Sequence, residues 1–95
     1  MGTLDARLTD IEEQALYSED VYEIYNIFED RDSASMDFAE RARIPVEEAN
    51  EMWTNEIVRF SIPGEPLVAA ITFDKEKHIK YCLFSTGRVA IVEFY

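Results

Sequence analysis

The only histidine and the only cysteine, His78 and Cys82, are the residues whose types could form a nucleophile and its base. They stand four positions apart in a segment rich in β-branched and aromatic residues. On an extended strand that spacing separates them by about 13 Å, so they form no catalytic pair unless the fold brings other groups in. A single cysteine also excludes an internal disulfide, which suits a reducing cytoplasm. We interpret Cys82 as a small apolar residue of a strand.

The carboxylates offer two further kinds of chemistry, metal binding and acid–base catalysis. Asp30-Arg31-Asp32 begins like a calcium-binding loop, but Ala34, Ser35 and Arg41 stand where that loop needs an oxygen ligand, a glycine and a closing glutamate. The three glycines are too far apart for a phosphate-binding loop. The other acids fall on predicted helix faces among polar neighbours, which is typical of solvated surface. We therefore expect no metal, no cofactor and no enzymatic activity.

The acidic residues define the strongest global signal, a net charge of -11. Residues 1–60 hold sixteen Asp and Glu against five Arg, whereas residues 61–95 hold four acids and four bases. Such an asymmetric field repels nucleic acid and membranes and favours a basic partner. Simple solubility and a halophilic source are the alternatives; six Arg against three Lys fit a halophile, but thirteen Glu against seven Asp fit it less well. No apolar run approaches the ~20 residues of a membrane span, and no signal peptide is evident, so we expect a cytoplasmic protein.

Helices are predicted throughout the acidic segment, residues 1–60. Helical spacing of Leu4, Leu8, Ile11 and Ala15 predicts the first helix, with Thr9 and Glu12 as a capping box. A second start signal at Ser18 precedes a helical face made by Val21, Ile24, Tyr25 and Phe28, and one kinked helix or two would both fit. A turn over 30–35 leads to a short helix from Ser35. Ile44-Pro45 ends that helix, and the next runs to about Phe60.

Strands are predicted after the Pro- and Gly-rich loop at 61–66. The runs Leu67–Phe73, Ile79–Phe84 and Val89–Tyr95, joined by polar turns, indicate a three-stranded antiparallel meander. The chain is thus expected to be one α+β domain, 1–95, helical over residues 1–60 and a meander over residues 61–95. The last two strands do not alternate cleanly between apolar and polar residues, which is typical of sheets covered on both faces. Either the first helix covers the second face, or a second copy or a partner does; the last strand, ending at Tyr95, could also add to a partner's sheet.

The segment Ser35–Thr54 resembles a helix-turn-helix. Ala39 stands at the family's small crossing position, and the apolar offsets are occupied by Phe38, Ala42, Ile44, Ala49 and Met52. The family usually has Gly in the turn, where the backbone is left-handed, and this chain has Arg43 instead. With helices before it and strands after it, the whole resembles a winged-helix domain. The resemblance implies that the exposed face of the second helix is Val46, Glu47, Asn50, Glu51 and Thr54, with Glu48 and Glu56 nearby.

Two functions follow from that face. Asn50 could read adenine, but carboxylates stand where a DNA reader needs Lys or Arg to neutralise phosphates. We therefore expect a regulator or inhibitor that mimics the charge of DNA and contacts a basic, possibly nucleic-acid-binding protein through Glu47, Glu48, Asn50, Glu51, Thr54 and Glu56, with Trp53 at the rim. The alternative is a winged-helix transcriptional regulator, dimeric and from an acidic or halophilic proteome. Its nucleic-acid contacts would be Arg41, Arg43, Asn50, Lys75, Lys77 and Lys80.

Overall fold

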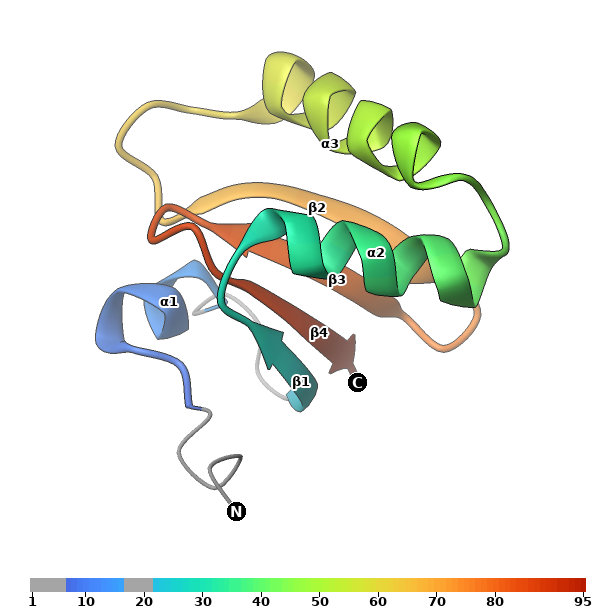
Figure 1. Cartoon of the computed structure of the whole chain (residues 1–95). Helices are drawn as coiled ribbons and strands as arrows, with labels where there is room; N and C mark the ends of the chain where they lie inside the picture. Colours follow the sequence, from blue (N-terminus) through green and yellow to red (C-terminus); the bar gives the residue numbers. More distant parts are fainter. Residues whose placement is uncertain (1–6, 17–21) are drawn as a thin grey trace.

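Two helices lie over one face of a four-stranded antiparallel sheet in the computed structural model, which describes residues 7–16 and 22–95 (Figure 1). In chain order the described elements are α1 (Asp10–Ala15), β1 (Tyr22–Phe28), α2 (Arg31–Ala42), α3 (Val46–Phe60), β2 (Leu67–Asp74), β3 (Ile79–Phe84) and β4 (Val89–Phe94). The strand order is β1-β4-β3-β2, so β1 and β2 are the edges of the sheet. The expected α+β class is confirmed, and the three strands of the meander are joined by a fourth.

The additional strand, β1, occupies a segment in which the sequence predicts a helix, and that prediction is wrong. β1 pairs with β4, for example Ile24 with Val92, and a bulge leaves Tyr25 without a partner before Asn26 pairs with Ile91. The bulge interrupts the two-residue alternation of a strand, so the apolar residues around it fall at helical spacing. The helix start expected at Ser18 and the residue Val21 lie outside the described residues.

Pairing by β1 also changes the role of β4. The last strand lies between β1 and β3, hydrogen-bonded on both sides. The expectation that it could add to a partner's sheet is therefore wrong, because its backbone groups are already paired. The exposed edge of the meander is β2 instead.

Helix α2 begins at Arg31, four residues earlier than expected, because Asp30 caps it. The Asp30 carboxylate accepts a hydrogen bond from the Ser33 backbone N–H at 2.8 Å. This hydrogen bonding lowers the pKa of Asp30 below its ordinary value. The run that begins like a calcium loop thus serves as a helix start. Helix α3 begins after Pro45, as expected.

The turn between α2 and α3 has a left-handed residue, as helix-turn-helix turns do, although this sequence has Arg43 in place of glycine. Arg43 is left-handed, with φ 59° and ψ 47°, and its N–H bonds to the carbonyl of Ala39. The Ile44 N–H bonds to the same carbonyl at 3.0 Å. These two bonds end α2, so an arginine here adopts the conformation that glycine takes most easily.

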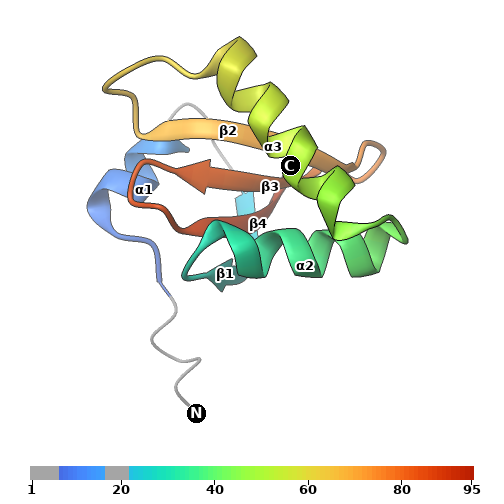
Figure 2. The same cartoon turned by 45° about the horizontal axis from the view of Figure 1, so that its top comes forward.

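The main core lies between the helix pair and the sheet (Figure 2). Phe38 of α2 and Trp53 of α3 pack against the strands, and Trp53 is completely buried. Phe38 makes an edge-to-face contact with Tyr81, their ring centroids 5.1 Å apart. The other buried members are small or aliphatic: Ala34, Ala39, Ala49, Ala69, Ile71, Leu83, Val89 and Ile91.

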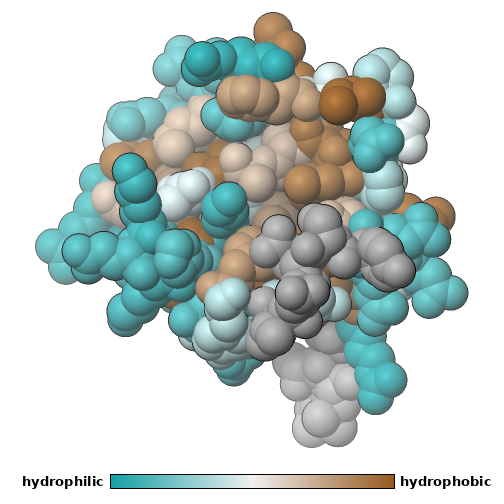
Figure 3. All heavy atoms as spheres, turned by 180° about the vertical axis from the view of Figure 1, so that it is seen from behind, coloured by the Kyte–Doolittle hydropathy of each residue, from teal (hydrophilic) through white to brown (hydrophobic). Residues whose placement is uncertain are grey.

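The second face of the sheet carries its own apolar cluster, partly covered by α1. Leu16 and Cys82 are buried there with Phe84, Ala90 and Val92, and Leu8 and Ala15 pack against them. Apolar side chains gather in the middle of this side (Figure 3). The expectation that the first helix covers this face is met in part, since α1 is only six residues long. A homodimer through the sheet stays a prediction.

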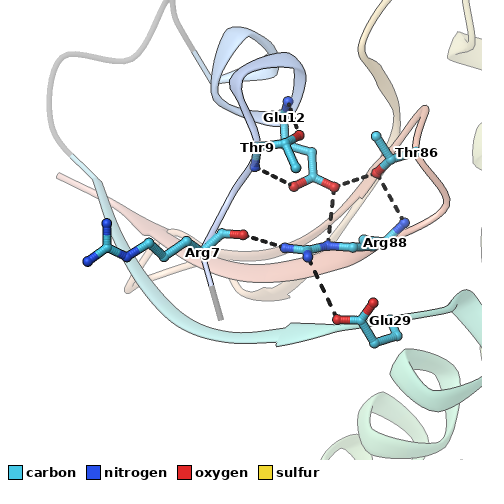
Figure 4. A network of polar contacts seen from close by, with 6 residues as sticks. All are labelled: Arg7, Thr9, Glu12, Glu29, Thr86 and Arg88. Atoms are coloured by element: carbon cyan, nitrogen blue, oxygen red, sulfur yellow. Dashed lines mark hydrogen bonds and ion pairs between the residues drawn. The ribbon is translucent and has the colours of Figure 1, made fainter. Parts of the chain in front are cut away.

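Helix α1 is fastened by a polar network centred on Glu12, which is completely buried (Figure 4). The expected capping box is present, and the Glu12 carboxylate accepts from the Thr9 N–H at 2.9 Å. The same carboxylate accepts from the Thr86 hydroxyl and lies 3.3 Å from Arg88 Nε. Arg88 also donates to the Arg7 carbonyl at 2.6 Å. The network joins the N-terminal segment to the turn between β3 and β4.

Candidate functional site

The exposed side of α3 is acidic and carries most of the predicted partner-binding residues. Ala49 and Trp53 point into the core, and the opposite side of the helix is exposed. We call the exposed residues of its N-terminal part, up to Thr54, the acidic face: Glu47, Glu48, Asn50, Glu51 and Thr54. Two predicted residues lie apart from it. Glu56 is half-buried beside β2, and Val46 packs against the core, so its predicted exposure is wrong.

The carboxylates of the acidic face are not neutralised within the described residues. Among the described residues, ion pairs join Asp37 to Arg41 and join both Glu12 and Glu29 to Arg88. None of these ion pairs involves a residue of α3. Glu47 and Glu48 lie in the first turn of α3, where their charge is favourable to the helix dipole. The acidic face therefore combines a stable helix start with negative charge directed at solvent.

Trp53 does not lie at the rim of this face, so the position predicted for it is wrong. Its side chain is wholly buried, and its indole N–H has no hydrogen-bond partner among the described residues. Trp53 follows Ala49 by four positions, so both occupy the inward side of α3. The tryptophan is therefore a core residue.

The basic residues of the alternative interpretation are all exposed, and two of them lie close together. Arg41 and Lys77 line one hollow of about 450 Å³, together with Phe73 and Tyr81. Arg41 is also paired with Asp37 at 2.9 Å. The remaining cations are Arg43 in the helix–helix turn, Lys75 in the strand turn, and Lys80, whose ammonium lies 5.9 Å from the Phe94 ring centroid.

The structure places the two residues considered for catalysis, His78 and Cys82, at the second face of the sheet. Cys82 is buried in the second-face cluster, and His78 ends the exposed turn before β3 with φ 59°. Both residues border one hollow of about 280 Å³, with Lys80 also in its lining. Across residues 7–16 and 22–95, no group of three His, Cys, Asp or Glu is placed to hold a metal ion.

A groove between α3 and β2 was not foreseen from the sequence. It encloses about 740 Å³ and is lined by Leu67–Thr72 of β2, by Lys80 of β3 and by one side of α3: Met52, Asn55, Glu56, Arg59 and Phe60. Phe60 is 60% exposed, an unusual value for a phenylalanine beside a groove. The uncharged residues of β2 were the one sequence signal that could have indicated this groove. That β2 lies at an edge of the sheet, however, depends on the pairing of all four strands.

Tyr81 predicts how the fold responds to alkaline pH. Its hydroxyl donates to Asp37 Oδ2 at 2.6 Å, and burial, then this hydrogen bond, raises the Tyr81 pKa well above its ordinary value. Unfolded tyrosine loses its proton near pH 10. The free energy of unfolding should therefore fall as pH rises above about 10, because the unfolded state then releases a proton that the folded state keeps.

Tyr81→Phe should weaken that pH dependence and lower the free energy of unfolding near neutral pH by about 1 kcal/mol through the lost hydrogen bond. Urea unfolding measured at several pH values between about 8 and 11 checks both effects around the tyrosine pKa. Tyr22→Phe is the control, because Tyr22 packs against the cluster on the other face of the sheet, away from Asp37. An unchanged slope in Tyr81→Phe would contradict the assignment.

No helix among the described residues is long and apolar enough to cross a membrane. The chain matches no protein-family model, and no curated protein or solved structure is significantly similar to it, so its surfaces are the basis for a functional proposal.

Proposed function

We propose that this protein is a small, non-catalytic, cytoplasmic protein-binding module whose acidic face contacts a basic surface of another protein. The observation that supports it most directly is the set of exposed carboxylates on one turn of α3, Glu47, Glu48 and Glu51, which form no ion pair within the part of the chain that the structure describes. Proteins that bind nucleic acid present Lys and Arg to phosphates. Such a surface is the complement of the acidic face, so the module acts as a regulator or inhibitor by occupying it.

The physical chemistry sets what this contact can supply. A net charge of -11 steers a basic partner toward the module and raises the association rate. Each exposed ion pair contributes only about 0.2–1 kcal/mol. Several pairs and some buried area are therefore needed for stable binding, and the complex should weaken as salt screens the charges.

The proposal predicts that Glu47→Gln, Glu48→Gln and Glu51→Gln together abolish partner binding while the fold is kept. The wild-type protein is immobilised, exposed to a lysate of its native host at low and at high salt, and the captured proteins are identified by mass spectrometry. A basic protein retained at low salt and released at high salt is the expected result. The triple variant should lose it, since all three changes lie in the proposed contact.

The matched control changes Glu40, Glu65 and Glu76 to Gln. These three residues are also exposed and lie outside α3, so the net charge changes equally but the acidic face does not. Retention by the control and loss by the α3 variant would support a local contact. Equal loss from both variants would reduce the effect to net charge, and wild-type capture by the α3 variant would contradict the proposal.

A winged-helix DNA-binding regulator is the second candidate. The left-handed Arg43 favours it, because the helix-turn-helix family has this conformation at the same point of the turn. Arg41 and Lys77, which line one hollow, add two cations on the side where the β2–β3 turn would act as a wing. The acidic face opposes it. DNA fragments retained on the protein as salt rises would favour this candidate over the first.

A further inference from the structure

Strand β2 is an edge strand whose central part, Ala69–Thr72, carries none of the features that protect edge strands. Among the described residues only β3 pairs with it, so alternate residues of β2 direct their N–H and C=O groups away from the sheet. Its first seven residues, Leu67–Phe73, contain no charge, no proline and no glycine. Edge strands that remain unpaired usually carry charged residues, a proline or a bulge, which discourage a further strand from pairing. Its two bulges lie toward its ends, and between them Ala69–Thr72 pairs regularly with β3.

The opposite edge is protected. Strand β1 has its bulge at Tyr25, in the middle of the strand, and carries the charged Glu23. Both features discourage a further strand from pairing there. The two edges of the same sheet thus differ, and β2 is the one fitted to receive a strand.

The groove beside β2 has an acidic helical wall. Glu56 lines it directly. Glu48 precedes the groove residue Met52 by one turn, and Glu51 precedes the groove residue Asn55 by one turn, so both lie on the same side of α3. From Glu48 to Glu56 the helix rises about 12 Å. Same-face residues of an extended strand recur about every 6.7 Å, so two strand periods match that span.

We propose that this groove takes an extended, basic segment of a protein partner as an additional strand on β2. Main-chain hydrogen bonds to β2 supply the pairing, and alternate Lys or Arg side chains face Glu48, Glu51 and Glu56. The inference rests on the proposed function and specifies its binding mode as strand addition. Arg59 of α3 and Lys80 of β3 also line the groove, so the basic positions of the segment are limited to those that face Glu48, Glu51 and Glu56.

A second copy of this chain fits the groove less well. Both copies would carry a net charge of -11, and their acidic faces would approach each other along the shared edge. Repulsion between the negative charges of the two copies opposes that association, whereas a basic segment is attracted to the same negative charges.

The test uses an eight-residue peptide of alternating Lys and Val, added to the whole protein and followed by amide NMR and hydrogen exchange. Alternate amides within Leu67–Asp74 should gain protection, and those of β1 should not. A peptide of the same sequence, N-methylated at alternate positions, keeps its charge but loses main-chain donors; its affinity should fall at least tenfold. The double variant Glu48→Gln with Glu51→Gln should bind the unmodified peptide more weakly than the wild type does. The control variant Glu40→Gln with Glu65→Gln should bind it as the wild type does.

The outcomes separate this inference from the proposed function. Equal binding of both peptides, with shifts confined to the acidic face, would overturn strand addition and leave the charge-based contact in place. Equal binding of an alternating Glu and Val peptide would overturn the basic identity of the segment. Dimers in sedimentation, with β2 protected before any peptide is added, would show that a second copy occupies the edge and would also overturn the inference.

Discussion

Trp53→Ala is expected to lower the free energy of unfolding by about 3–5 kcal/mol. Trp53 is the largest completely buried side chain and lies between α3 and the sheet. Its removal loses the transfer free energy of the indole and leaves a cavity in a core cluster to which the helices contribute the small residues Ala34, Ala39 and Ala49. A domain of this length has a total stability of about 5–14 kcal/mol. The variant should therefore be close to unfolding at physiological temperature.

Urea unfolding followed by far-ultraviolet circular dichroism measures this loss, because the tryptophan itself is no longer available as a fluorescent probe. Val58→Ala is the matched control: it lies on the same helix, is 79% exposed and should change the free energy by less than about 0.5 kcal/mol. Equal stability of Trp53→Ala and wild type would mean that the indole is not in the core and lies at the rim of the acidic face instead.

Local signals predicted the features of the fold that depend on neighbouring residues. Pro45 separates α2 from α3, and the loop after Phe60 separates helices from strands, so these boundaries could be read directly. The phase of α3 follows in part from its sequence, because Ala49 and Trp53 share a side that excludes Glu47 and Glu51. The exposure of the acidic face could therefore be predicted. The predicted positions of Val46 on the exposed face and of Trp53 at its rim were nevertheless wrong.

Strand β1 could not be predicted in the same way. Ile24 pairs with Val92, sixty-eight positions later, and nothing near Ile24 indicates that partner. The bulge at Tyr25 then gives the local apolar pattern a helical spacing. Pairing across the sheet outweighed local preference, as tertiary context often does.

Because β1 was not predicted, the sequence could not decide which strand of the meander is the exposed edge. In a three-stranded meander both the first and the last strand are edges, so the sequence offered Val89–Tyr95 as the strand that could join a partner. Strand β1 covers that edge and leaves β2 exposed. The choice of β2 over β4 as the strand that can accept a partner therefore depends on one long-range pairing, whereas the acidic face depends only on helical phase.

Glu12→Gln is expected to lower the free energy of unfolding by about 3 kcal/mol, the range found when one partner of a buried pair is removed. Arg88, whose side chain is only 20% exposed, would lose its nearest carboxylate and keep Glu29 at 3.7 Å (Figure 4). The neutral amide can still accept from the Thr9 N–H, so the loss reports mainly the charge. Glu13→Gln is the control, since Glu13 is exposed on the same helix.

The loss should be local, because the network fastens α1 to the turn before β4 and contacts neither α2 nor α3. Cys82 lies in the apolar cluster with Leu16, next to α1, and Trp53 lies on the opposite face of the sheet, so the chain carries a probe for each side. Glu12→Gln should speed the modification of Cys82 by a thiol reagent by roughly 100-fold, the factor that corresponds to about 3 kcal/mol. Trp53 fluorescence should stay native.

A double change of Glu12 and Arg88 to Met should cost less than the sum of the single changes, since no unpaired charge is left buried. Additive losses, or a Cys82 rate equal to that of wild type, would mean that the apolar contacts of Leu16 hold α1 without the network.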